Sequence, residues 1–143
     1  MTDIILQRAV DQALEDLRMR SKKSIYKTDP VAWASDVLGK TLWSKQQEIL
    51  YSIRDNQRTA VRSCNNAGKT ATAGVAGAWF IAVHDPHDTV VMCTAPGFKQ
   101  IKTNLFNEFN INMRASKERK MKLPGVILTS SNAAEWKLED GTE

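Results

Sequence analysis

The sequence Ser63-Cys64-Asn65-Asn66-Ala67-Gly68-Lys69-Thr70 is the stretch on which the predicted fold depends. It follows the phosphate-binding pattern G-x-x-x-x-G-K-[ST] except at the first position, where Ser63 replaces glycine. Residues 59–62 before it alternate like a short strand, and residues 70–82 after it are rich in small residues and helical in character. A strand, a polar loop and a helix N-terminus in this order direct backbone N–H groups toward an anion. We therefore predict an α/β fold with a phosphate site.

The residue types of this segment, called here the phosphate-binding loop, suit a nucleoside triphosphate. Gly68 has no Cβ, so the backbone can approach the phosphates closely. Lys69 would reach the β- and γ-phosphates as the catalytic cation, and the Thr70 hydroxyl would bind Mg²⁺. Asn65 and Asn66 tolerate left-handed conformations, which partly compensates for the missing first glycine. The alternative is a strand–helix turn that contains a glycine and a solvated lysine.

Three further features flank the loop. The amide of Gln46, upstream in the sequence, can both donate to and accept from an adenine edge. Thr94-Ala95-Pro96 follows the apolar run 89–93, a predicted buried parallel strand, and ligands bind at the carboxyl ends of such strands. Arg62 directly precedes the loop and can stabilise charge on a transferring phosphoryl group. The alternatives are, respectively, a surface glutamine, an ordinary strand–helix connection and an outward-facing strand residue.

Helices are predicted on both sides of this segment. Asp29 and Pro30 form a typical helix start, and Gly39 suits the left-handed position after its end. Ser44 and Gln47 form a capping-box pattern for the next helix. The expected helices span residues 4–20, 30–38, 44–55, 70–84 and 97–112, and the expected strands span residues 59–63, 89–93, 126–128 and 134–138.

The chain has 143 residues, of which 42% are hydrophobic, and a net charge of +4. This length and composition are those of one ordinary globular domain. Such a modest excess permits an anionic partner but does not establish one. Cys64 and Cys93 lack the spacing of a disulfide framework or a zinc site, and no apolar run is long enough for a membrane span. We therefore expect a soluble intracellular protein. His84 and His87 flank Asp85-Pro86, where a solvated turn is favoured over a metal site.

These motifs, in this order, resemble the ATPase domain of phage large terminase subunits, the motors that package DNA into capsids. The resemblance covers residues 29–143 as the N-terminal portion of a P-loop ATPase domain. It leaves residues 1–28 as an N-terminal helix and a basic linker, which is either solvated or a contact for DNA or a protein partner. The matching residues are Trp43 to Leu50, Val61-Arg62-Ser63 with Gly68-Lys69-Thr70, Trp79-Phe80, Thr94-Ala95-Pro96 with Gln100, and Glu135-Trp136-Lys137-Leu138 with Asp140-Gly141.

The resemblance implies a P-loop NTPase three-layer α/β fold with a mainly parallel sheet, incomplete in this chain and preceded by helices. It matches Gln46 to the adenine-sensing Q motif, residues 63–70 to the Walker A loop and residues 94–96 to motif Ia. In the parent protein, ATP hydrolysis would drive translocation of double-stranded DNA by a homo-oligomeric ring, with a portal and a small terminase subunit as partners in the host cytoplasm. The residues expected to bind ATP and Mg²⁺ are Gln46, Ser63, Cys64, Asn65, Asn66, Ala67, Gly68, Lys69 and Thr70.

The sequence departs from the terminase pattern in two ways. Residues 64–67 lack the arginine that terminases often carry inside the loop, and Arg62 lies before it. No hydrophobic run ending in Asp-Glu, the Walker B element, follows the loop. We therefore expect a fragment that alone hydrolyses ATP poorly or not at all. The alternatives are a helicase-like ATPase and a non-catalytic nucleotide- or DNA-binding module.

Overall fold

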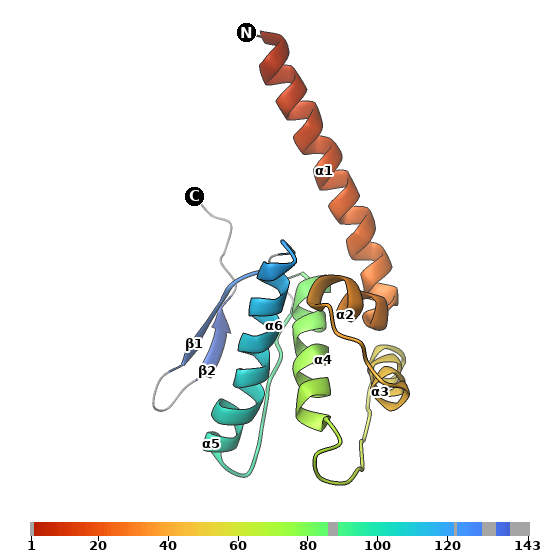
Figure 1. Ribbon diagram of the computed structural model, residues 1–143, viewed down its shortest axis with the longest axis vertical. Coiled ribbons are helices and arrows are strands. Elements are labelled where there is room, and N and C mark those ends of the chain that lie inside the picture. Colours follow the sequence, from red (N-terminus) through yellow and green to blue (C-terminus); the bar gives the residue numbers. More distant parts are fainter. Residues whose placement is uncertain (1, 86–88, 122, 130–133, 138–143) are drawn as a thin grey trace.

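The computed structural model describes residues 2–85, 89–121, 123–129 and 134–137 (Figure 1). Within these ranges helices predominate, and they are joined by short extended or irregular segments. In chain order, the elements are α1 (Thr2–Thr28), α2 (Pro30–Leu38), α3 (Ser44–Asp55), α4 (Lys69–Val83), the short α5 (Phe98–Gln100), a π-helical turn η1 (Ile101–Leu105), α6 (Phe106–Glu118), β1 (Val126–Thr129) and β2 (Ala134–Lys137).

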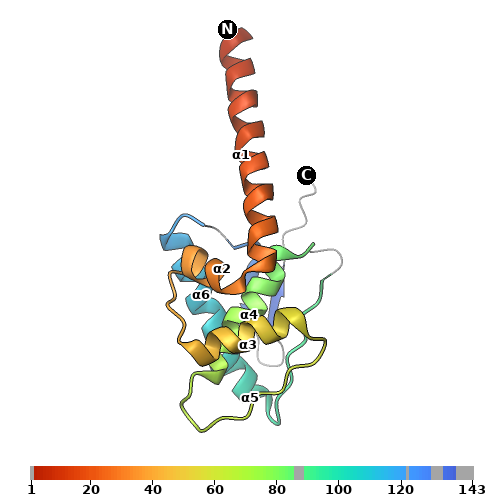
Figure 2. The ribbon, with the colours of Figure 1, turned by 90° about the vertical axis from the view of Figure 1, so that its right-hand side faces the viewer.

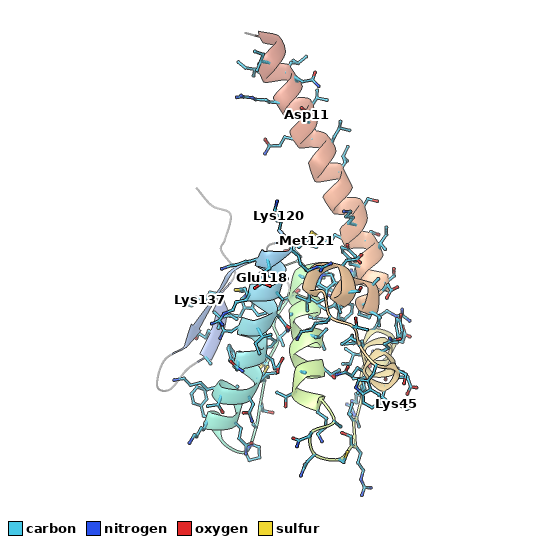
Figure 3. All side chains as sticks on the ribbon, viewed as in Figure 1. Asp11, Lys45, Glu118, Lys120, Met121 and Lys137 are labelled. Carbon is cyan, nitrogen blue, oxygen red and sulfur yellow. The ribbon has the colours of Figure 1, made fainter. Side chains whose placement is uncertain are left out.

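Helix α4 forms the centre of the molecule, with α6 on one side and α2 and α3 on the other (Figures 1 and 2). The β1–β2 ribbon lies beyond α6, and α1 projects from the body. Figure 3 shows Lys120 and Met121 at the same end of the body as the base of α1, whereas Lys45 lies on α3 toward the other end. The buried hydrophobic cluster consists of Trp33, Ala34, Val37, Leu38, Leu42, Leu50, Val75, Ala76, Ala78, Trp79, Val83 and Leu123.

Small residues allow α4 to lie very close to α6. A Cβ added at Gly77 would come within 2.9 Å of the Phe109 ring, and one added at Gly74 within 2.7 Å of the Glu108 Cβ. The sequence correctly predicts a closely packed helix after the phosphate-binding loop. Its partner, however, is helix α6 rather than a sheet.

The predicted ends of α2 are confirmed. The Asp29 carboxylate accepts the backbone N–H groups of Val31 at 3.1 Å and Ala32 at 3.0 Å, and thereby satisfies donors that have no carbonyl partner within the helix. Gly39 adopts the left-handed conformation (φ 65°) that closes the helix.

The predicted bounds of α3 are confirmed, but its capping box lies one residue earlier than predicted. The helix begins at Ser44, so Trp43 occupies the N-cap position and Gln46 the third helical position. It is therefore the Gln46 side chain, not that of Gln47, that reaches back to accept the Trp43 N–H, at 3.3 Å. The Gln47 amide instead donates to the Leu42 carbonyl at 2.7 Å.

The predicted three-layer α/β fold with a mainly parallel sheet is wrong. The sheet in the described residues is a two-stranded antiparallel ribbon in which Ile127 lies opposite Trp136, and residues 59–63 and 89–93 form no strand. A strand requires a neighbour that pairs with its N–H and C=O groups, and neither segment has such a ladder here. Several of their apolar side chains are correspondingly exposed, Val61 by 44%, Val90 by 80% and Met92 by 84%, whereas Val91 is half-buried.

Other boundaries also move. Helix α1 continues through the basic stretch to Thr28 instead of ending at residue 20. The helix predicted over 97–112 is observed as α5, η1 and α6, which together run from Phe98 to Glu118. The strands predicted at 126–128 and 134–138 are present and pair with each other. The turn predicted at 140–141 lies outside the described residues. Of the helices described, none has the length and apolar character needed to cross a bilayer.

Candidate nucleotide-binding site

The phosphate-binding loop leads directly into α4. Gly68 is the N-cap of this helix and has a left-handed backbone (φ 78°, ψ 17°). Asn66 is also left-handed (φ 60°), in agreement with the sequence expectation that asparagine supplies this conformation in the loop. The first helical hydrogen bond runs from the Thr72 N–H to the Gly68 carbonyl at 2.9 Å. The N–H groups of residues 69–71 therefore have no carbonyl partner within the helix, and they can donate hydrogen bonds to an anion.

Lys69 folds back over the loop that precedes it. Its Nζ donates to the backbone carbonyl oxygens of Ser63 at 3.0 Å and Cys64 at 2.6 Å. No ion pair joins it to a carboxylate of the described residues. The positive charges of the ammonium group and of the helix N-terminus thus meet at the same loop without a neutralising acid.

Gln46 connects α3 to this loop. Its Nε2 donates to the Thr72 Oγ1 at 3.1 Å, and Thr72 Oγ1 donates to the Gly68 carbonyl at 2.9 Å. The same Nε2 lies 2.9 Å from the position that a Cβ would occupy on Gly68. Gly68 therefore suits both its left-handed backbone, which L side chains rarely adopt, and the close approach of the Gln46 amide, which would have to shift to admit a Cβ.

Sequence reasoning missed Thr72, which is 3% exposed and forms two hydrogen bonds next to the loop. The signal in the sequence that points to Thr72 is its position four residues after Gly68. A threonine at that spacing can return its hydroxyl to the carbonyl one helical turn earlier.

A pocket of about 340 Å³ opens between α3 and the loop. Gln46 of the upstream motif and Lys69 of the loop line it together with Arg62 and Trp43. The remaining lining residues are Lys45, Glu48, Ile49, Ser52, Thr59, Ala60, Val61, Ser63, Ala67 and Thr72. Residues 94–96 do not line this pocket, so the structure brings together two of the three predicted motifs and Arg62.

The other predicted candidates have different surroundings. The His84 ring stacks on Phe80 with 4.0 Å between ring centroids, and its Nδ1 lies 2.9 Å from the Phe80 carbonyl oxygen. His87 lies outside the described residues. A second pocket, of about 390 Å³, is lined mainly by apolar side chains and by Cys93, and burial raises the pKa of the Cys93 thiol. Cys64 in the phosphate-binding loop is exposed. The described residues contain no cluster of three or more metal-ligating His, Cys, Asp or Glu side chains.

No family model, curated protein or solved structure matches this chain. Function is therefore inferred from the residues and the geometry of the site itself.

Proposed function

We propose that the chain binds ATP with Mg²⁺ at the phosphate-binding loop and is the ATP-binding portion of a viral DNA-packaging motor of the large terminase class. One observation carries the nucleotide assignment. The Lys69 ammonium group lies over a loop that ends at the N-terminus of α4, held by the carbonyls of Ser63 and Cys64. The order of the Gln46 motif, the loop and the Thr94-Ala95-Pro96 motif along the sequence supports the terminase class.

The chemistry of the loop suits a triphosphate. The N–H groups of residues 69–71 would donate to phosphate oxygens, and the field of the helix N-terminus favours the negative charge. The Lys69 ammonium group would exchange neutral carbonyl partners for charged phosphate oxygens, which form shorter and stronger hydrogen bonds. The Thr70 hydroxyl, exposed at the first turn of α4, is the group that would hold Mg²⁺. Arg62 faces the same pocket and would add positive charge.

Equilibrium binding of a fluorescent ATP analogue to the whole chain, with Mg²⁺ present, tests this assignment. Lys69→Ala is expected to weaken binding by about tenfold or more, because it removes a charged hydrogen bond worth about 1.5–3 kcal/mol. Lys22→Ala is the matched control, since it removes a lysine that lines a different pocket, with Tyr26 and Asp36, away from the loop. Equal affinities for Lys69→Ala and the unmodified chain would exclude the loop as the phosphate site.

The same protein is expected to hydrolyse ATP poorly or not at all. Hydrolysis needs a held metal and a positioned water, and the sequence after the loop has no hydrophobic run ending in paired acids. A phosphate-release assay on the purified chain measures this directly. A turnover that Lys69→Ala abolishes would contradict the expectation.

A further inference from the structure

Gln46 and the phosphate-binding loop are joined by a continuous chain of hydrogen bonds. The Trp43 N–H donates to Gln46 Oε1 at 3.3 Å, and Gln46 Nε2 donates to Thr72 Oγ1 at 3.1 Å. Thr72 Oγ1 in turn donates to the Gly68 carbonyl at 2.9 Å. These hydrogen bonds run from Trp43, the N-cap of α3, to Gly68, the N-cap of α4. These two helices are in contact, although the loop and residues 56–62 separate them in sequence.

Each end of the Gln46 amide makes a hydrogen bond to a protein group in this arrangement. A glutamine that reads adenine uses one N–H donor and its carbonyl acceptor together on the base edge. Here the oxygen accepts the Trp43 N–H, and the nitrogen donates to Thr72 while it packs against Gly68. The amide therefore has a role within the protein that involves no base.

The consequence for the loop follows from the planarity of the peptide bond. Two donors of Thr72, its hydroxyl and its N–H, converge on the Gly68 carbonyl oxygen, both at 2.9 Å. Because a trans peptide unit is planar, fixing the direction of the Gly68 carbonyl also fixes the Lys69 N–H, which points the opposite way. That N–H is one of the donors without a carbonyl partner in the helix, and it is available to an anion.

We propose that Gln46 and Thr72 are positioning residues that orient the Gly68–Lys69 peptide for phosphate, so that Gln46 controls triphosphate affinity whatever base is attached. The proposal rests on the proposed function. It differs from base recognition in one measurable respect: loss of the Gln46 amide weakens binding of ATP, GTP and inorganic tripolyphosphate by the same factor.

The experiment compares the affinities of the whole chain for these three ligands, each with Mg²⁺, by calorimetry. Gln46→Leu and Thr72→Val are each expected to weaken all three affinities about three- to tenfold, the range for one lost hydrogen bond. Thr72→Ser keeps the hydroxyl and is expected to restore the affinity. Gln47→Leu is the matched control, because Gln47 lies on the same helix but donates to the Leu42 carbonyl and not toward the loop.

A spectroscopic measurement separates positioning from general destabilisation. In the ligand-free protein, Thr72→Val is expected to shift the amide resonance of Lys69, whereas Gln47→Leu leaves it in place. Should Thr72→Val fail to fold, the ligand affinities and the Lys69 amide resonance are measured on Gln46→Leu instead, because Gln46 is only half-buried.

Two results would overturn the proposal, and they are distinguishable. A loss of ATP affinity in Gln46→Leu with unchanged tripolyphosphate affinity would assign Gln46 to the base and leave the proposed function intact. If the wild-type chain binds none of the three ligands, both the proposed function and this inference are refuted.

Discussion

Asn112 is the most informative position at which to test the packing of α4 against α6. Its side chain is 0% exposed, and among the described residues neither its Nδ2 nor its Oδ1 has a hydrogen-bond partner. The Nδ2 lies 3.6 Å from the position of a Cβ on Gly74, at the contact between the two helices. Leucine has the same branching as asparagine but carries methyl groups in place of the polar atoms. We therefore expect Asn112→Leu to stabilise the fold.

The magnitude follows from two opposing terms. Removing an unsatisfied buried amide recovers about 1–3 kcal/mol. The two methyl groups are larger than the atoms they replace, and overpacking beside Gly74 offsets part of that gain. We expect a net increase of about 1–2 kcal/mol in the free energy of unfolding, which raises the Tm of a domain of this size by about 3–8 °C.

Thermal and urea unfolding, followed by circular dichroism, measure the effect. Asn110→Leu is the matched control on the same helix, because the Asn110 Nδ2 already donates to the Phe106 carbonyl at 3.0 Å. This control is expected to give no gain in stability. A decrease of 1 kcal/mol or more in Asn112→Leu would show that the amide is satisfied in solution and would refute the reasoning.

Three further predictions concern the loop, the core and the cysteines. Gly68→Ala is expected to weaken nucleotide-analogue binding and to destabilise α4 by about 1–2 kcal/mol, since alanine is strained at φ 78° and its Cβ would lie 2.9 Å from the Gln46 amide. Chemical denaturation measures the loss of stability, and titration with the analogue measures the loss of affinity. A variant with unchanged stability and affinity would contradict this prediction. Leu50→Ala removes a side chain that is 0% exposed, so a loss of about 2–5 kcal/mol is expected in urea unfolding, and a loss below 1 kcal/mol would show that the core is not formed as described. Iodoacetamide at pH 8 is expected to modify Cys64 faster than Cys93, because Cys64 is exposed while burial raises the pKa of the Cys93 thiol and lowers its thiolate fraction. Peptide mass spectrometry over time measures the two rates. Faster modification of Cys93 would contradict the burial of its thiol.

Local signals in the sequence predicted the features that depend on neighbouring residues. Asp29 and Gly39 define the ends of α2 because an N-cap carboxylate and a left-handed glycine act within one turn of the chain. The left-handed Asn66 and the start of α4 at Lys69 follow from the loop pattern in the same way.

Features that depend on distant partners could not be predicted in this way. An alternating or apolar run indicates which side chains are suited to burial. It does not indicate whether another strand of the fold lies beside that run and pairs with its backbone. Residues 89–93 have the composition of a buried strand and form none, whereas residues 126–129 form a strand because residues 134–137 pair with them. The small residues of α4 likewise indicate close packing without naming its partner.

The site was predictable in its parts and less so in its connections. The pattern around Lys69 predicts a phosphate-binding loop, which stays a prediction, and Gln46 and Lys69 line one pocket. The hydrogen bonds of Gln46 depend on Trp43, rather than Ser44, being the N-cap of α3, a one-residue difference that sequence patterns do not resolve. Thr72 has a role only because α3 brings the Gln46 amide to it.

Helix α1 gives the molecule a long projecting arm (Figures 1 and 2). Its 27 residues span about 40 Å, and at its base the Trp79 indole N–H donates to the Tyr26 carbonyl at 2.8 Å. Trp79 belongs to α4, the helix whose first residue is Lys69. A pivot of about 10° at this base would move the tip by about 7 Å, so a distance probe near residue 6 would report small changes in the angle between α1 and the body.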